Sequence, residues 1–308
     1  MAQIGVELLG MRFRNPVIPA AGPNVGNGAR LCQAAEGGAG GLLAKTISTK
    51  AAAVPRPHMQ RYGSTGLLNT ELWSELPPEA WLDHEYETGL TAARKHGIPF
   101  LASIGYSPAE LRQLGPVVEA MGVDALEFSI HYLDPAQLVE TAKALRDAVH
   151  IPIIAKLSPH KGDLGELAAA IEPYVDGFAC INSYGPALHI DLERMEPMLG
   201  SALGYGWLSG SPIRPLALRS VYEVARRVKK PVIGVGGATT GSDVIAFFMA
   251  GASLVQVCTA ILLRGQSHYG RMAREVNDWL DQHGYTDIKE IQGLYLRHAG
   301  CAGGGLVG

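Results

Sequence analysis

The chain has 308 residues and a net charge of −3, and 47% of its residues are hydrophobic while 18% are charged. This composition is typical of a globular protein with a large core. The mild negative charge excludes a broad basic surface for nucleic acid or anionic lipid.

The four cysteines are scattered and form no CxxC pair, which argues against a disulfide framework and against an iron–sulfur cluster held by this chain. The first ten residues, MAQIGVELLG, lack the pattern of a signal peptide, and no apolar run reaches membrane-spanning length. We therefore expect a cytoplasmic protein without a membrane span.

Short apolar runs recur along the chain, and most precede a stretch with the apolar spacing of an amphipathic helix. We expect strands at about Pro16–Ala21, Gly41–Thr46, Phe100–Ile104, Ala125–Ser129, Ile151–Leu157, Gly177–Asn182, Pro231–Val235 and Ser253–Cys258. Expected helices include Pro108–Met121, Ala136–Val149 and Leu216–Val228. This alternation predicts an α/β protein, a (β/α)₈ TIM barrel forming one domain over residues 1–308.

An open doubly wound sheet is the alternative fold. It is disfavoured because AAGP, rather than GxGxxG, follows the first strand, and because GVGGATTG at 234–241 has no third glycine in register. Two connections, at about 47–97 and 183–214, are too long to be turns. Both begin just after an expected strand, so we expect long functional loops on the catalytic rim of the barrel.

Lys156 lies near the end of one expected strand. A lysine there either faces an anionic ligand or extends to water at the rim, and the sequence leaves both open. Other polar residues also end expected strands: Lys45, Thr46, Ser129, Asn182, Ser183 and Thr259. Gly236 and Gly237 follow the seventh strand, and glycines there let backbone N–H groups approach a phosphate. The alternative for these two glycines is a tight turn.

The ten histidines show no HExxH motif and no pair of histidines spaced with a carboxylate, so we expect no metal site.

Several short motifs stand at successive strand ends: AAGP (20–23), LAKTIST (43–49), NTEL (69–72), AKLSP (155–159), INSYG (181–185), HIDLE (189–193), LSGSPIRP (208–215) and GVGG (234–237). In this order they resemble the FMN-dependent dihydroorotate and dihydropyrimidine dehydrogenase family, and the likeness runs from residue 6 to about residue 293. The segment NTELWSELPPEAW looks closer to the dihydropyrimidine branch.

The resemblance implies an FMN site and a site for a small cyclic substrate. The FMN-binding residues it implies are Ala21, Gly22, Lys45, Thr46, Lys156, Asn182, Gly210, Gly236, Gly237 and Thr259. Lys156 would lie near the flavin edge where negative charge develops on reduction. The substrate-binding residues it implies are Asn69, Ser129, Asn182 and Ser183.

The fourth strand departs from the family pattern Glu-Leu-Asn-x-Ser-Cys-Pro. Ser129 replaces the asparagine, and Tyr132 stands where the family has its catalytic base. A tyrosine is a better acid than base at neutral pH, whereas the adjacent His131 titrates near neutrality. We expect Tyr132, His131 and Lys45 to be the catalytic residues. Whether Tyr132 donates a proton, His131 accepts one, or neither does chemistry stays open.

The sequence thus predicts an FMN-dependent oxidoreductase acting on a CH–CH or C=C bond conjugated to a carbonyl, in a dihydroorotate- or dihydropyrimidine-like ring. The alternatives are a flavin-free phosphate-binding barrel lyase or isomerase with Lys156 as an electrostatic or Schiff-base lysine, and a flavin subunit with weakened chemistry. The resemblance implies a homo-oligomer. The electron partner is not identified, so fumarate, a quinone, NAD(P)H and a separate iron–sulfur subunit all stay open.

Overall fold

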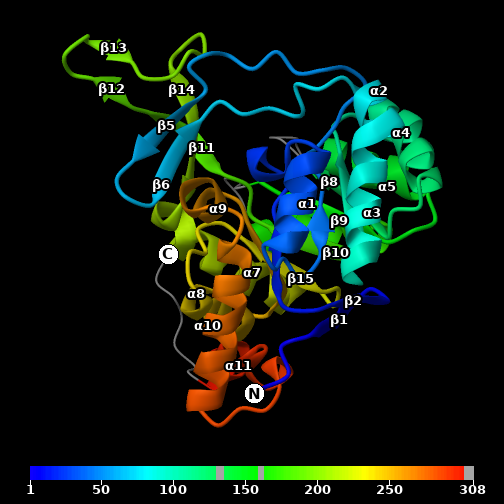
Figure 1. Cartoon of the computed structure of the whole chain (residues 1–308), viewed down its shortest axis with the longest axis vertical. Coiled ribbons are helices and arrows are strands. Elements are labelled where there is room, and N and C mark those ends of the chain that lie inside the picture. The colour runs from blue at the N-terminus through cyan, green and yellow to red at the C-terminus, as the bar shows by residue number, and fades with distance from the viewer. Residues whose placement is uncertain (130–134, 159–162, 302–308) are drawn as a thin grey trace.

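The computed structural model describes residues 1–129, 135–158 and 163–301. Its centre is an eight-stranded parallel sheet curved into a barrel, with strands in the order β3-β16-β15-β10-β9-β8-β7-β4 (Figure 1). These strands are β3 (Val17–Pro19), β4 (Leu42–Leu43), β7 (Phe100–Ile104), β8 (Ala125–Ser129), β9 (Ile153–Leu157), β10 (Gly177–Cys180), β15 (Val232–Val235) and β16 (Ala252–Val257). A hydrogen bond of 2.7 Å from Gly40 N to Val17 O ties the segment before β4 to β3, so the barrel is nearly closed.

The predicted barrel is confirmed. Each expected strand is present, and its ends differ from the expected ones by three residues or fewer. The doubly wound alternative is wrong, because the two end strands of the sheet lie side by side. In the described parts of the chain, no helix combines the length and the apolarity needed to cross a bilayer.

Helices cover the outside of the barrel (Figure 1). They are α1 (Gly28–Glu36), α3 (Tyr86–His96), α4 (Pro108–Ala120), α5 (Pro135–Arg146), α6 (Leu164–Ile171), α7 (Arg214–Arg227), α8 (Gly241–Met249) and α10 (His268–Gln282), with the shorter α2 (Pro78–Ala80), α9 (Thr259–Arg264) and α11 (Leu294–Cys301). Their apolar faces pack on the sheet closely. A Cβ on Gly89 of α3, for example, would lie 2.4 Å from Cε2 of Phe100 on β7.

The two long connections are not irregular loops throughout. They pair with each other in a four-stranded antiparallel sheet of order β11-β14-β6-β5 above the barrel (Figure 1). Its strands are β5 (Met59–Tyr62), β6 (Gly66–Asn69), β11 (Tyr184–Leu188) and β14 (Tyr205–Gly210). Two smaller hairpins complete the fold: β1 (Val6–Leu8) with β2 (Met11–Phe13), and β12 (Ile190–Asp191) with β13 (Glu196–Pro197).

Glu110, in the first turn of α4, ties two barrel segments together. Its carboxylate accepts hydrogen bonds from Ser48 Oγ, in the segment after β4, from Ser107 N at 2.9 Å and from Tyr106 N at 3.1 Å. Burial would raise the pKa of this carboxyl, but the hydrogen bonds from Ser48, Ser107 and Tyr106 outweigh burial and lower the pKa to about 2. Glu110 is therefore ionised and fixes the start of α4 against the segment after β4.

Because the folded-state pKa of Glu110 lies below the ordinary carboxyl value of ~4.3, its contribution to stability is present above that value and is lost as the pH falls towards 2. We expect Glu110→Gln to make the free energy of unfolding less steeply dependent on pH between about pH 5 and pH 2. Ser48→Ala should give an intermediate slope. Urea denaturation at a series of pH values measures this, and equal slopes for wild type and Glu110→Gln would contradict it.

Candidate active site

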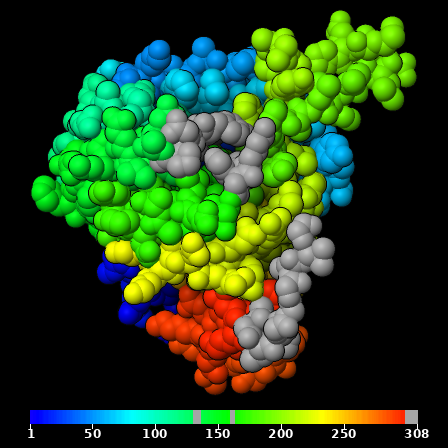
Figure 2. Space-filling view, turned by 180° about the vertical axis from the view of Figure 1, so that it is seen from behind, coloured from blue at the N-terminus to red at the C-terminus, as the bar shows by residue number. Residues whose placement is uncertain are grey.

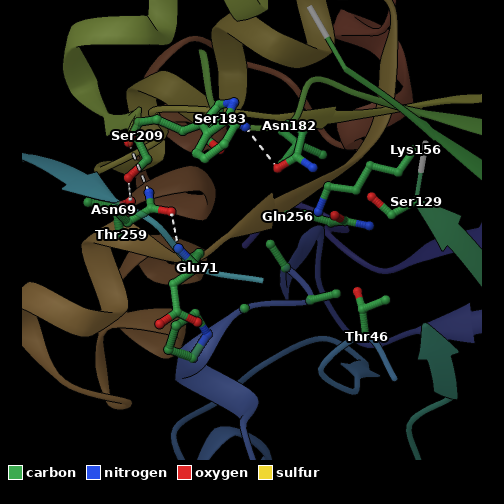
Figure 3. A pocket seen from close by; sticks show the side chains of 18 of the residues that line it. Thr46, Asn69, Glu71, Ser129, Lys156, Asn182, Ser183, Ser209, Gln256 and Thr259 are labelled. Atoms are coloured by element: carbon green, nitrogen blue, oxygen red, sulfur yellow. Dashed lines mark hydrogen bonds between the residues drawn. The ribbon is translucent and has the colours of Figure 1, made fainter. Parts of the chain in front are cut away.

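A cavity of about 510 Å³ opens at the carboxyl ends of the barrel strands. Its size suits a small-molecule or cofactor site. The antiparallel sheet contributes one wall through residues that include Met59, Leu67 and Trp207. Figure 3 shows Asn69, Glu71, Ser209 and Thr259 on one side of the cavity and Ser129, Lys156, Asn182 and Gln256 on the other.

Every described residue that the sequence predicts to bind cofactor or substrate lines this one cavity. They are Ala21, Gly22, Lys45, Thr46, Asn69, Ser129, Lys156, Asn182, Ser183, Gly210, Gly236, Gly237 and Thr259. They meet here because parallel strands bring their carboxyl ends to the same rim. The predicted acid/base candidates Tyr132 and His131 lie outside the described residues.

Lys45 is buried beside the cavity and is ion-paired. Only 5% of the residue is exposed, and its Nζ lies 2.8 Å from Oε2 of Glu71. The other carboxylate oxygen of Glu71 lies 3.4 Å from Nε2 of His58. Glu71 thus holds Lys45 at the cavity wall and balances its charge.

Lys156 is also buried and paired, so the open alternative of a lysine that extends to water is wrong. Its Nζ lies 3.6 Å from Oε1 of Glu127, which is fully buried in the barrel interior. Glu127 and Ser129 are two apart on β8 and therefore point to the same face. The other oxygen of Glu127 accepts a hydrogen bond from Nε2 of Gln256 on β16, across the barrel.

Glycines at one end of the cavity form a tight cradle. Gly210, Gly236 and Gly237 all have positive φ, at 85°, 116° and 85°. A Cβ on Gly237 would lie 2.7 Å from Gly210 O, and a Cβ on Gly210 would lie 2.9 Å from Cγ2 of Thr259. Among the described residues, no hydrogen-bond acceptor is found for the backbone N–H groups of Gly236 and Gly237. These backbone N–H groups at the end of the cavity can donate to an anionic group.

The uncharged polar residues of the cavity are partly engaged with one another. Asn69 accepts a hydrogen bond from Glu71 N at 3.2 Å and donates one to Trp207 O at 3.0 Å, so it joins β6 to β14. Thr259 Oγ1 donates to Ser209 Oγ at 2.9 Å (Figure 3). Asn182 Oδ1 accepts a hydrogen bond of 2.9 Å from Ser183 N. Among the residues that the structure describes, the side-chain NH₂ of Asn182 has no acceptor, so it can donate to a ligand in the cavity.

Two other titratable groups of the cavity are held neutral. Burial raises the pKa of the Cys258 thiol to about 11, against the smaller opposing effect of Lys45 and Lys156. Burial and the nearby charge of Glu110 raise the pKa of the Tyr106 phenol. Neither group is therefore a base at neutral pH.

Sequence reasoning missed the acidic partners Glu71 and Glu127. Glu71 stands inside the NTEL motif, but nothing in the sequence places it beside Lys45. Glu127 carried a usable signal, because a carboxylate in an otherwise apolar strand needs a buried partner. In the described ranges, no three histidine, cysteine or acidic side chains gather as a metal site, and the absence of a metal stays a prediction.

Removing one partner of the buried Lys156–Glu127 pair leaves the other charge uncompensated, which costs about 3–5 kcal/mol in comparable cases. We expect Lys156→Met and Glu127→Gln each to lower the free energy of unfolding by about that amount. The double variant should lose less than the sum of the two single losses. Urea denaturation of the four proteins measures this cycle, and strictly additive losses would show that the two side chains do not interact.

Comparison with known proteins agrees with this geometry. A family model described as dihydroorotate dehydrogenase matches residues 132–280. The catalytic subunit of dihydroorotate dehydrogenase B (NAD(+)) from Pyrococcus furiosus is 33% identical over 94% of this chain and 98% of its own length. The corresponding subunits from Pyrococcus abyssi, at 34% identity over 95% and 99%, and Geobacter sulfurreducens, at 33% over 94% and 97%, are similar to the same extent. Because these relatives are 33–34% identical over nearly the whole of both chains, the chain belongs to the dihydroorotate dehydrogenase family.

Proposed function

We propose that this protein is an FMN-dependent oxidoreductase acting on a CH–CH or C=C bond next to a carbonyl in a dihydroorotate- or dihydropyrimidine-like ring. One observation carries the proposal: two buried lysines and a glycine cradle line a single cavity at the barrel mouth. The names of the relatives, all dihydroorotate dehydrogenases, support the reaction type.

The cavity residues fit FMN. In our proposal the amides of Gly236 and Gly237 bind its phosphate, with Gly210 and Thr259 beside them. Ala21, Gly22, Lys45 and Thr46 line the space for the flavin ring, and Asn182 extends an amide group towards it. When bound, FMN supplies an acceptor for a hydride. Lys156, held in place by Glu127, is a fixed cation that stabilises negative charge without reorganisation.

The uncharged polar groups Asn69, Ser129, Asn182 and Ser183 are the proposed contacts for a ring substrate. Oxidation of a CH–CH bond releases one proton as well as one hydride. Tyr132 and His131 remain our proposed acid/base candidates, and Lys45 our proposed electrostatic group beside the reacting ring.

A flavin-free lyase or isomerase with a Schiff-base lysine is the weaker candidate. A carboxylate beside Lys156 favours a charged lysine acting electrostatically over a nucleophilic amine. The third option is a flavin subunit with weakened chemistry, in which neither Tyr132 nor His131 transfers a proton. The substrate test below distinguishes it from the active oxidoreductase.

We propose a separate electron-transfer partner, because the relatives are named as catalytic subunits. A homo-oligomer and a cytoplasmic location also stay predictions.

The segment from β11 to β14 projects from the body, at the upper right of Figure 2, and carries exposed apolar side chains at Leu188, Ile190, Leu192, Met195 and Leu203. This arm is the surface we expect a second copy to cover.

The proposed reaction is tested by anaerobic mixing of the FMN-loaded protein with dihydroorotate and with dihydropyrimidines. We expect at least one of these compounds to bleach the flavin absorbance within seconds. A colourless protein that cannot be reconstituted with FMN would contradict the oxidoreductase. A flavin that binds but is reduced by none of these compounds would support the subunit with weakened chemistry.

The glycine cradle is tested by Gly237→Ala, which places a Cβ against Gly210 O. We expect FMN affinity, measured by fluorescence titration of the apoprotein, to fall by about tenfold or more. Gly122→Ala is the matched control, because Gly122 has a similar φ of 82° but open space around its Cβ position. Equal affinity losses in both variants would show that backbone strain, and not the cradle, causes the effect.

A further inference from the structure

We infer that the cavity selects an uncharged cyclic amide over a ring that carries a carboxylate, and that Glu71 sets this selection. The inference rests on the proposed function and deepens it. The two substrate classes, a dihydropyrimidine-like ring and a dihydroorotate-like ring, differ by one carboxylate. The dehydrogenases to which this chain is similar are named for dihydroorotate, the ring with the carboxylate.

The cations of the described cavity wall are already matched by acids. Lys45 and Lys156 are the lysines among the described lining residues, which include no arginine or histidine. Lys45 is paired with Glu71 at 2.8 Å and Lys156 with Glu127 at 3.6 Å. Glu110 adds another carboxylate to the lining. A substrate carboxylate therefore meets no unmatched cation on this part of the wall.

Glu71 is fixed in place. Oε2 contacts Lys45, Oε1 faces His58 at 3.4 Å, and the backbone N–H of Glu71 donates to Asn69 Oδ1 at 3.2 Å. Its side chain is only 16% exposed. These contacts keep the Glu71 carboxylate beside Lys45 at the cavity wall.

A carboxylate entering this cavity loses water and gains little attraction in return, because Glu71 cancels the charge of Lys45. An uncharged ring amide loses less hydration free energy than a carboxylate does and needs no cation. Its N–H and C=O groups match the uncharged side chains across the cavity from Glu71, such as Asn182 and Ser129 (Figure 3). The polar groups of the cavity therefore suit hydrogen bonding to a neutral ring.

The test uses the oxidised, FMN-loaded protein titrated with uracil and with orotate, and reads binding from the flavin absorbance. We expect wild type to bind uracil at least about tenfold more tightly than orotate. Glu71→Gln keeps the size of the side chain and removes its charge, so it should reduce this ratio about tenfold through tighter orotate binding. Glu75→Gln is the matched control, because Glu75 is about half exposed, is paired with Arg56 and does not line the cavity. It should keep the wild-type ratio.

A second variant tests the inference if Glu71→Gln does not fold. Met59→Lys keeps Glu71 and adds a cation to the sheet wall, so it should strengthen orotate binding more than uracil binding. Wild type that prefers orotate, or Glu71→Gln and Met59→Lys variants that both leave the ratio unchanged, would overturn the inference alone. A protein that takes up no FMN, or whose flavin responds to neither compound, would overturn the proposed function as well.

Discussion

The site depends on the requirement that a buried charge has a partner. Lys45 and Lys156 both lie at the barrel mouth with almost no exposure, and each is held by a carboxylate from another segment. Without Glu71 and Glu127, neither ammonium group would be stable in that position. The two pairs give the cavity fixed cations whose charge is balanced before any ligand arrives.

The two pairs differ in what surrounds them. Glu127 lies in the barrel interior, where Gln256 contacts it from a strand across the barrel, so this pair is part of the core. Glu71 lies in the rim segment after β6, between Lys45 and His58, and lines the cavity itself. The carboxylate of the first pair is therefore enclosed by the core, whereas the carboxylate of the second is part of the cavity wall.

The barrel was largely predictable because each strand is a short apolar run bounded by turn residues, and such runs are local signals. The residues of the cavity were predictable for a related reason: parallel strands bring all their carboxyl ends to one rim, so polar residues at those positions must converge. The resemblance then distinguished FMN contacts from substrate contacts, and these roles stay predictions. The acid/base roles of Tyr132 and His131 also stay predictions, outside the described residues.

Long-range pairing was not predictable. The rim segments form a sheet in which Asn69 contacts Trp207, 138 residues away, and no local pattern encodes that register. The same holds for Lys45 and Glu71, which are 26 residues apart and join the barrel rim to the segment after β6. Contacts of this kind depend on the tertiary fold and leave no local signal in the sequence.

A crystal structure of the protein with FMN tests the central claim most directly. We predict that the flavin ring lies within hydrogen-bonding distance of both Lys45 and Lys156, with the phosphate on the amides of Gly236 and Gly237. A flavin bound away from either lysine, or a phosphate held elsewhere on the barrel, would contradict the account.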